Sequence, residues 1–180
     1  QVGFSLYSDM LARAVDALQN GEEPDLDAPL HRGIEIELYV PALIPETYLA
    51  DVQARLTLYK RIASARTPAG LRELQVEMID RFGLLPDAVK NLFEIAELKR
   101  TAERIGITHL DFGPGGGRIE FSEQSTADPQ ALVRLMQESG GNYRMQGPQK
   151  LRILLQQADA RRRIDEARRV LSELNSDKIY

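Results

Sequence analysis

The apolar residues change their spacing at Gly106, and this change limits the possible folds more than any other feature of the sequence. Before it, three segments carry apolar residues at the helical period, at about 47–65, 68–82 and 86–105. After it, short strand-like segments alternate with turns that contain Gly and Pro. A block of helices beside hairpin-connected strands favours an α+β fold over a doubly wound parallel sheet. We therefore expect a small, mostly antiparallel sheet packed by a block of helices.

One strand is predicted ahead of the helices. Apolar Ile34, Ile36, Leu38 and Val40 alternate with Glu35, Glu37 and Tyr39. Alternation at a period of two residues buries one face of a strand and exposes the other. The pattern predicts a strand over 34–40 that ends at Pro41.

The first 33 residues differ in character from the rest of the chain. Apolar residues between Phe4 and Leu18 fall on one helical stripe, which ends at Asn20-Gly21. Residues 21–33 then contain two Pro, two Gly and four acids without any periodicity. We expect a helix at 1–20, an acidic linker at 21–33 and a single domain at 34–180.

The helix at 68–82 carries a ridge of mixed charge. Thr67 and Pro68 suit its N-cap and first position, and Gly83 suits its C-cap. The ridge consists of side chains that recur along the face opposite to the apolar stripe: Glu73, Glu77, Asp80 and Arg81. Such a ridge is either a solvated surface or a docking site for a complementary partner, and spacing alone favours the solvated surface.

The helix near the C-terminus carries the best candidates for nucleic-acid contact, which are Arg161, Arg162, Arg163, Arg168 and Arg169. Opposite charges four residues apart, as in Arg161–Asp165, Arg162–Glu166 and Asp165–Arg169, favour a self-neutralised, solvated helix face instead. The net charge of −4 also argues against a dedicated nucleic-acid binder. A small DNA-binding module that uses this basic helix remains the alternative function.

The sequence shows no pattern of catalytic, metal or cofactor chemistry. The glycine run at 113–117 precedes Arg118 and a strand, not the Lys, Ser/Thr and helix of a phosphate loop, so it predicts a plain hairpin loop. His31 and His109 lack metal-site spacing, and there is no cysteine. No apolar run approaches the ~20 residues that span a bilayer. We expect a cytoplasmic, non-enzymatic segment without a cofactor.

Several distinctive segments lie along nearly the whole chain: Val2–Tyr7, Arg55–Ala65, Ile79–Pro86, Gly117–Phe121, and Tyr143-Arg144 with Gly147-Pro148. In this order they resemble the C-terminal domain of the bacterial transcription-repair coupling factors. The most specific are Tyr59–Ala65 and Ile79–Pro86. In that family, the opening segment follows the translocation motif at the edge of the motor.

The resemblance implies a function. The family's full protein is an ATP-dependent, helicase-like translocase on double-stranded DNA that displaces stalled RNA polymerase and recruits nucleotide-excision repair. Its C-terminal domain has no known catalytic role. It packs on an N-terminal module that resembles an excision-repair protein, masks that module's surface for the damage-recognition ATPase and represses the motor. The family's contact ridge matches Glu77, Asp80 and Arg81, so we expect the interdomain contact there and at Glu73.

Overall fold

Five helices and five strands follow one another along residues 33–176, the part of the chain that the computed structural model describes. In chain order they are β1 (Glu35–Glu37), α2 (Val52–Ser64), α3 (Pro68–Phe82), α4 (Asp87–Ile105), β2 (Ile107–Gly113), β3 (Gly116–Phe121), α5 (Pro129–Glu138), β4 (Tyr143–Met145), β5 (Lys150–Ile153) and α6 (Ala160–Leu174). The predicted helix at 1–20 and nearly all of the predicted linker lie outside the described residues.

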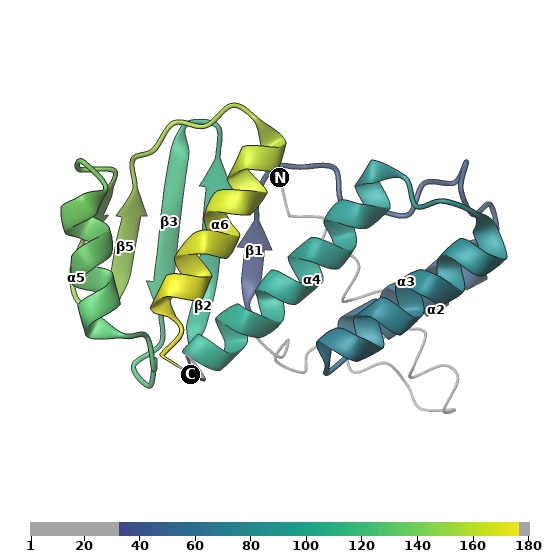
Figure 1. Cartoon of the computed structure of the whole chain (residues 1–180), viewed down its shortest axis with the longest axis horizontal. Coiled ribbons are helices and arrows are strands. Elements are labelled where there is room, and N and C mark those ends of the chain that lie inside the picture. Colours follow the sequence, from purple (N-terminus) through teal and green to yellow (C-terminus); the bar gives the residue numbers. More distant parts are fainter. Residues whose placement is uncertain (1–32, 177–180) are drawn as a thin grey trace, which may run out of the picture.

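The strands form one mixed sheet in the order β1-β2-β3-β5-β4. Only β1 and β2 pair in parallel, and the other three pairs are antiparallel. Helices α4, α5 and α6 lie on one face of this sheet (Figure 1). The predicted α+β class and the mostly antiparallel sheet are confirmed.

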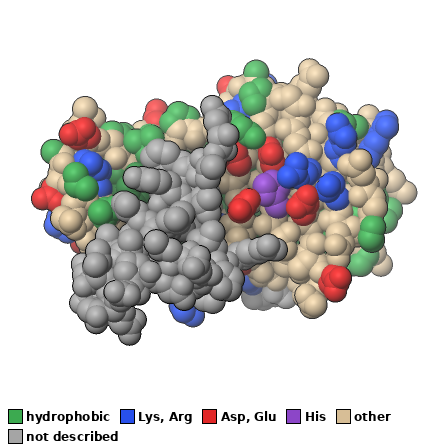
Figure 2. All heavy atoms as spheres, turned by 180° about the vertical axis from the view of Figure 1, so that it is seen from behind, with side chains coloured by type: hydrophobic (Ala, Val, Ile, Leu, Met, Phe, Trp, Pro, Cys, Tyr) green, Lys and Arg blue, Asp and Glu red, His purple; other side chains and the backbone are tan. Residues whose placement is uncertain are grey.

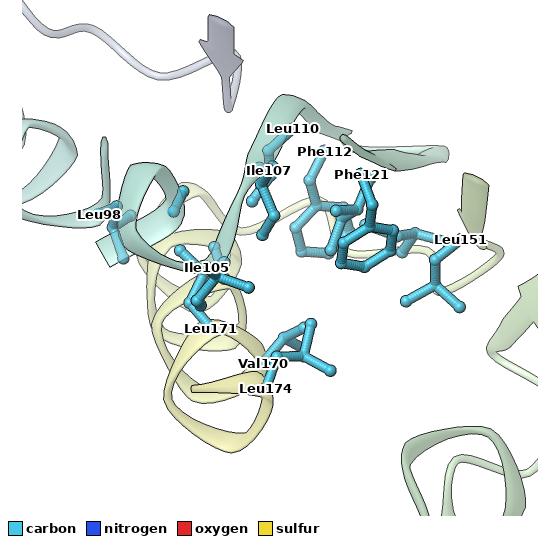
Figure 3. Packing of buried hydrophobic residues seen from close by; sticks show 14 of the residues in the cluster. Leu98, Ile105, Ile107, Leu110, Phe112, Phe121, Leu151, Val170, Leu171 and Leu174 are labelled. Carbon is cyan, nitrogen blue, oxygen red and sulfur yellow. The ribbon is translucent and has the colours of Figure 1, made fainter. Parts of the chain in front are cut away.

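The main hydrophobic core lies between the sheet and these three helices (Figure 3). Inward-facing residues of β2 and β3, such as Phe112 and Phe121, meet one side of α6, represented by Val170, Leu171 and Leu174. Leu174 is completely buried. The regular alternation of buried residues along the strands leaves their other side chains on the opposite, open face of the sheet.

The expected block of helices divides into two parts. Helices α2 and α3 stand beside the sheet rather than over it, and pack on the first half of α4 (Figure 1). In α4, Val89 and Phe93 belong to this second core, whereas Leu98, Ala102 and Ile105 belong to the core under the sheet. A helix of 19 residues is about 28 Å long, which is enough to serve both cores.

Helix ends lie close to their predicted positions, with one exception. Gly83 and Gly106 terminate α3 and α4 with φ angles of 95° and 84°, values that favour glycine. Helix α2, expected to begin near residue 47, begins at Val52 because the Asp51 carboxylate accepts from the Ala54 N–H at 2.8 Å.

The strand predicted over 34–40 is shorter than expected. Tyr39 adopts a φ of 55°, the only positive value for a non-glycine residue among residues 33–176, and this ends the extended backbone. Ile34 and Leu38 are buried as the alternation predicted. The prediction of a strand beyond Glu37 is wrong, and the carbonyl groups of Leu38 and Tyr39 bond to a side chain instead.

The glycine run at 113–117 forms the predicted hairpin, but most of it lies in the strands. Only Pro114 and Gly115 form the turn between β2 and β3. A Cβ atom at Gly117 would collide with the carbonyl oxygen of Asp111 on the neighbouring strand. Close approach of two backbones, rather than ligand binding, therefore accounts for this glycine.

Candidate functional site

Helix α3 presents the predicted ridge on a well-defined scaffold. The Thr67 side chain accepts from the Gly70 N–H at 3.0 Å, and Pro68 occupies the first turn, as predicted. One side of the helix buries Leu71, Leu74 and Met78 in the second core. The opposite side of α3 is exposed to solvent.

The four ridge residues lie on that exposed side but differ in their contacts. Glu73 and Asp80 are exposed and have no ion pair within residues 33–176. Glu77 is half-buried, and both of its carboxylate oxygens accept from Arg61 of α2, at 2.8 and 2.6 Å. Arg81 donates to Glu77 at 3.1 Å. These hydrogen bonds, chiefly those from Arg61, lower the pKa of Glu77 to about 2.

The Arg81 side chain also contacts an aromatic ring. Its guanidinium lies 4.8 Å from the centre of the Phe82 ring, a cation–π contact. Phe82 packs edge-on against Tyr48 at 6.1 Å between ring centres. The Tyr48 hydroxyl donates to the Gly83 carbonyl at 2.9 Å, which ties the end of α3 to the segment before α2. The side chain at position 81 is therefore positioned by its neighbours.

Exposed apolar side chains, which were not predicted from the sequence, adjoin the ridge. Val76, Ile79 and Leu84 are 58%, 38% and 85% exposed. Val76 and Ile79 lie on the helix outside the stripe that starts at Leu71, and this was the signal available in the sequence. We call the seven residues the α3 outer face: Glu73, Val76, Glu77, Ile79, Asp80, Arg81 and Leu84.

The arginines of α6, the alternative site, are largely engaged within the molecule. Arg163 is buried, with 3% of its surface exposed. Its guanidinium donates to the carbonyl oxygens of Leu38, Tyr39, Gln157 and Ala158 at 2.8–3.0 Å. Its assignment as a nucleic-acid contact is wrong, because a residue that links α6 to the end of β1 in the interior cannot reach a phosphate.

Two further arginines join α6 to α4. Arg161 donates to both carboxylate oxygens of Glu94, at 2.8 and 2.6 Å, and Arg168 donates to one of them at 3.0 Å. The predicted pair between Arg161 and Asp165 is confirmed at 2.7 Å. The contact with Glu94 was missed because 67 residues separate the partners.

The other two arginines of α6 differ from each other. Arg169 binds Glu166 and Glu173, both at 2.6 Å, so the predicted pair with Asp165 is wrong. The predicted pair between Arg162 and Glu166 is also wrong. Arg162 is exposed, and its side chain is the only one of the five arginines without a partner in the described part of the chain.

Residues 33–176 contain no cluster of three or more His, Asp or Glu side chains that could hold a metal ion. His109 lies beside Glu35, with 3.3 Å between its Nδ1 atom and a carboxylate oxygen. His31 lies outside the described residues. Within the same range, no helix is both long and apolar enough to cross a bilayer.

Known proteins resemble this chain along most of its length. The chain resembles the transcription-repair-coupling factors of Escherichia coli (strain K12), 42% identical over 99% of this chain, and of Haemophilus influenzae, 46% identical over 91%. It spans only 16% and 14% of the lengths of those relatives. That of Bacillus subtilis (strain 168) is 36% identical over 86% of this chain and 13% of its own length.

A solved structure and a family model complete the comparison. The crystal structure of the C-terminal domain of a transcription-repair coupling factor is 23% identical, and the match covers 81% of this chain and 96% of that one with a TM-score of 0.64. This likeness shows a shared fold. The sequence model of the TRCF domain family matches residues 38–132, more than half of the chain. The chain therefore belongs to the TRCF domain family of the transcription-repair coupling factors.

Proposed function

We propose that this chain is a non-catalytic regulatory domain that acts by covering a surface of another part of its parent protein. The parent is proposed to be an ATP-dependent translocase on double-stranded DNA that displaces stalled RNA polymerase in the cytoplasm. The surface covered is that of the N-terminal, excision-repair-like module, which binds the damage-recognition ATPase. While the α3 outer face occupies this module, recruitment is blocked and the motor is repressed.

The observation that carries the proposal is the composition of the α3 outer face. Exposed apolar side chains adjoin exposed acidic residues: Val76 and Ile79 lie on α3 itself, and Leu84 lies just after its C-cap. Specific protein–protein interfaces usually combine apolar and polar side chains in this way. A face kept only for solubility has no need of Leu84 at 85% exposure.

The contacts of Glu77 and Arg81 support the same interpretation. Arg61 donates to both carboxylate oxygens of Glu77, and the Phe82 ring makes a cation–π contact with the Arg81 guanidinium. Side chains that are ordered before binding lose less conformational entropy when a partner arrives. The face is therefore prepared for a partner of complementary charge and shape.

A contact of this kind also suits regulation. A contact between domains shifts a two-state equilibrium strongly when its free energy differs between the two states by only a few kcal/mol. Exposed charges contribute specificity and association rate more than affinity. The contact can therefore be selective and still release when another partner competes for the module.

The test is a triple charge reversal, Glu77→Lys/Asp80→Lys/Arg81→Glu, with binding to the purified N-terminal module measured by calorimetry at fixed salt. We expect the affinity to fall at least about tenfold, as reversal places like charges across the interface. A circular dichroism spectrum and thermal unfolding curve establish that the variant is folded.

A matched control separates this surface from net charge. Glu123→Lys/Glu138→Lys/Arg162→Glu changes the total charge by the same amount at exposed residues outside α3. The control is expected to bind like the unmodified chain. Equal affinities for the folded triple variant and the unmodified chain would contradict the assignment of the α3 outer face.

A further inference from the structure

The open face of the sheet carries charges in an order that the fold does not require. Five residues lie directly across from one another on neighbouring strands and form one row: Glu37, Asp111, Arg118, Arg152 and Arg144, from β1 through β2, β3 and β5 to β4. The row therefore has two acids at one end and three arginines at the other. We call it the charge row.

The adjacent row on the same face shows the arrangement that internal stability favours. It contains Glu35, His109, Glu120 and Lys150 at successive strands. Its members pair with one another, since His109 lies 3.3 Å from Glu35 and Lys150 lies 3.6 Å from Glu120. Opposite charges across strands stabilise a sheet, and like charges directly opposite destabilise it.

The charge row instead places like charges side by side. Arg152 lies between Arg118 and Arg144, and Glu37 lies opposite Asp111. Arg144 and Arg152 are exposed and have no carboxylate partner among residues 33–176, whereas Arg118 donates to Glu120 at 3.1 Å. Figure 2 shows acidic side chains gathered around the histidine, with Lys and Arg side chains continuing beyond it. The two signs of charge are thus segregated along the row.

The charge row changes from negative to positive along its length, and this change favours a protein partner over a nucleic acid. Neighbouring strands are about 4.8 Å apart, so the three arginines span only about 10 Å before the acids begin. A duplex, whose major groove alone is about 12 Å wide, would bring phosphates against Glu37 and Asp111. A protein surface can change sign over the same distance, and guanidinium groups bind carboxylates in a bidentate fashion.

The spacing of the row matches one secondary structure. Side chains on one face of a helix recur every three or four residues, about 5–6 Å apart, which is close to the distance between strands. We propose that the open face of the sheet is a docking surface for a helix of another protein segment, which lies across the strands and presents two basic residues followed by three acidic residues at successive turns. This surface is distinct from the α3 outer face and does not depend on its function.

The test uses two helical, alanine-rich peptides of about 20 residues. One carries Lys, Lys, Glu, Glu and Glu at successive turns, and the other carries the same residues in alternating order. Fluorescence anisotropy at low salt measures their binding to the 180-residue chain. We expect the ordered peptide to bind at least about tenfold more tightly, and added salt to weaken it.

Two single variants locate the binding site. Arg152→Glu is expected to weaken binding of the ordered peptide about tenfold, and Arg144→Glu serves as a second variant on the same row. Arg162→Glu, an equal charge change on the exposed side of α6, is expected to have no effect. Equal binding of the two peptides, equal effects of Arg152→Glu and Arg162→Glu, or tighter binding of a duplex of about 20 base pairs would overturn the proposal.

Discussion

Helices α3 and α6 both carry many charged residues, but their charges have different partners. On α6, four of the five arginines between 161 and 169 donate to oxygen atoms of the protein itself, and one of the four is buried. On α3, Glu73 and Asp80 are exposed without an ion pair in the described part of the chain. Arg161, Arg163 and Arg168 of α6 thus hold elements together, as the pair between Glu77 and Arg61 joins α3 to α2. On α3, however, Glu73 and Asp80 remain available to a partner.

The apolar residues near each helix differ in the same way. Helix α6 buries its apolar side chains, from Ile164 to Leu174, against the sheet. Helix α3 leaves Val76 and Ile79 exposed beside its charges. The comparison shows that a run of charge identifies a binding face only when its partners and its apolar neighbours are known.

The largest expected effect tests the structural role of α6. Arg163→Met retains much of the apolar volume but removes four hydrogen bonds to buried or half-buried carbonyl groups. Unpaired buried carbonyls are costly, so we expect the free energy of unfolding to fall by about 3 kcal/mol or more. Urea unfolding measures it, with the exposed Arg162→Met as the control. A loss below about 1 kcal/mol would show that the hydrogen bonds of Arg163 contribute little to the stability of the fold.

A smaller effect is expected where α6 meets α4. Glu94→Gln removes the charge that Arg161 and Arg168 share, and we expect a loss of about 1 kcal/mol at neutral pH, since the arginines are half-exposed. Hydrogen bonding from Arg161 is the largest cause that lowers the pKa of Glu94. Its stabilisation is therefore complete above the unfolded pKa of about 4.3 and is lost as pH falls through the folded pKa.

Urea unfolding between pH 7 and pH 3 measures the difference in the free energy of unfolding between the unmodified chain and Glu94→Gln. The gap between the unmodified chain and Glu94→Gln is expected to close as the solution becomes acidic. A gap of the same size at both ends of the range would mean that the carboxylate charge is not the cause.

The smallest effect on stability is expected on α3. Glu73→Lys/Asp80→Lys changes two exposed side chains that contact no other charged group within residues 33–176. We expect the free energy of unfolding to change by less than about 0.5 kcal/mol, since surface substitutions away from structural contacts have little effect. Thermal unfolding followed by circular dichroism measures it. A loss above about 1 kcal/mol would give these residues a structural role and end the contrast with α6.

Local chemistry determined the parts of the fold that the sequence predicted well. Thr67, Gly83 and Gly106 act within a few residues of themselves, so the ends of α3 and α4 could be read directly. The glycine run at 113–117 likewise separates the two strands that follow Gly106. The α+β class followed from these elements together.

Long-range contacts determined what the sequence could not predict. The buried position of Arg163 depends on carbonyl groups more than 120 residues away, and the ion pair of the exposed Arg161 depends on Glu94, which lies 67 residues away. The charge row exists only through the strand order, which places Arg118 beside Arg152 and Arg152 beside Arg144. For the α3 outer face, the sequence predicted the charges but not the exposed apolar side chains beside them.

The central claim is that the α3 outer face, and not the arginines of α6, binds the N-terminal module. The most direct test is a titration of the ¹⁵N-labelled chain with that module, followed by chemical-shift changes of the backbone amides. We expect the largest changes to fall between Glu73 and Leu84. Changes confined to Ala160–Leu174, with none on α3, would contradict it.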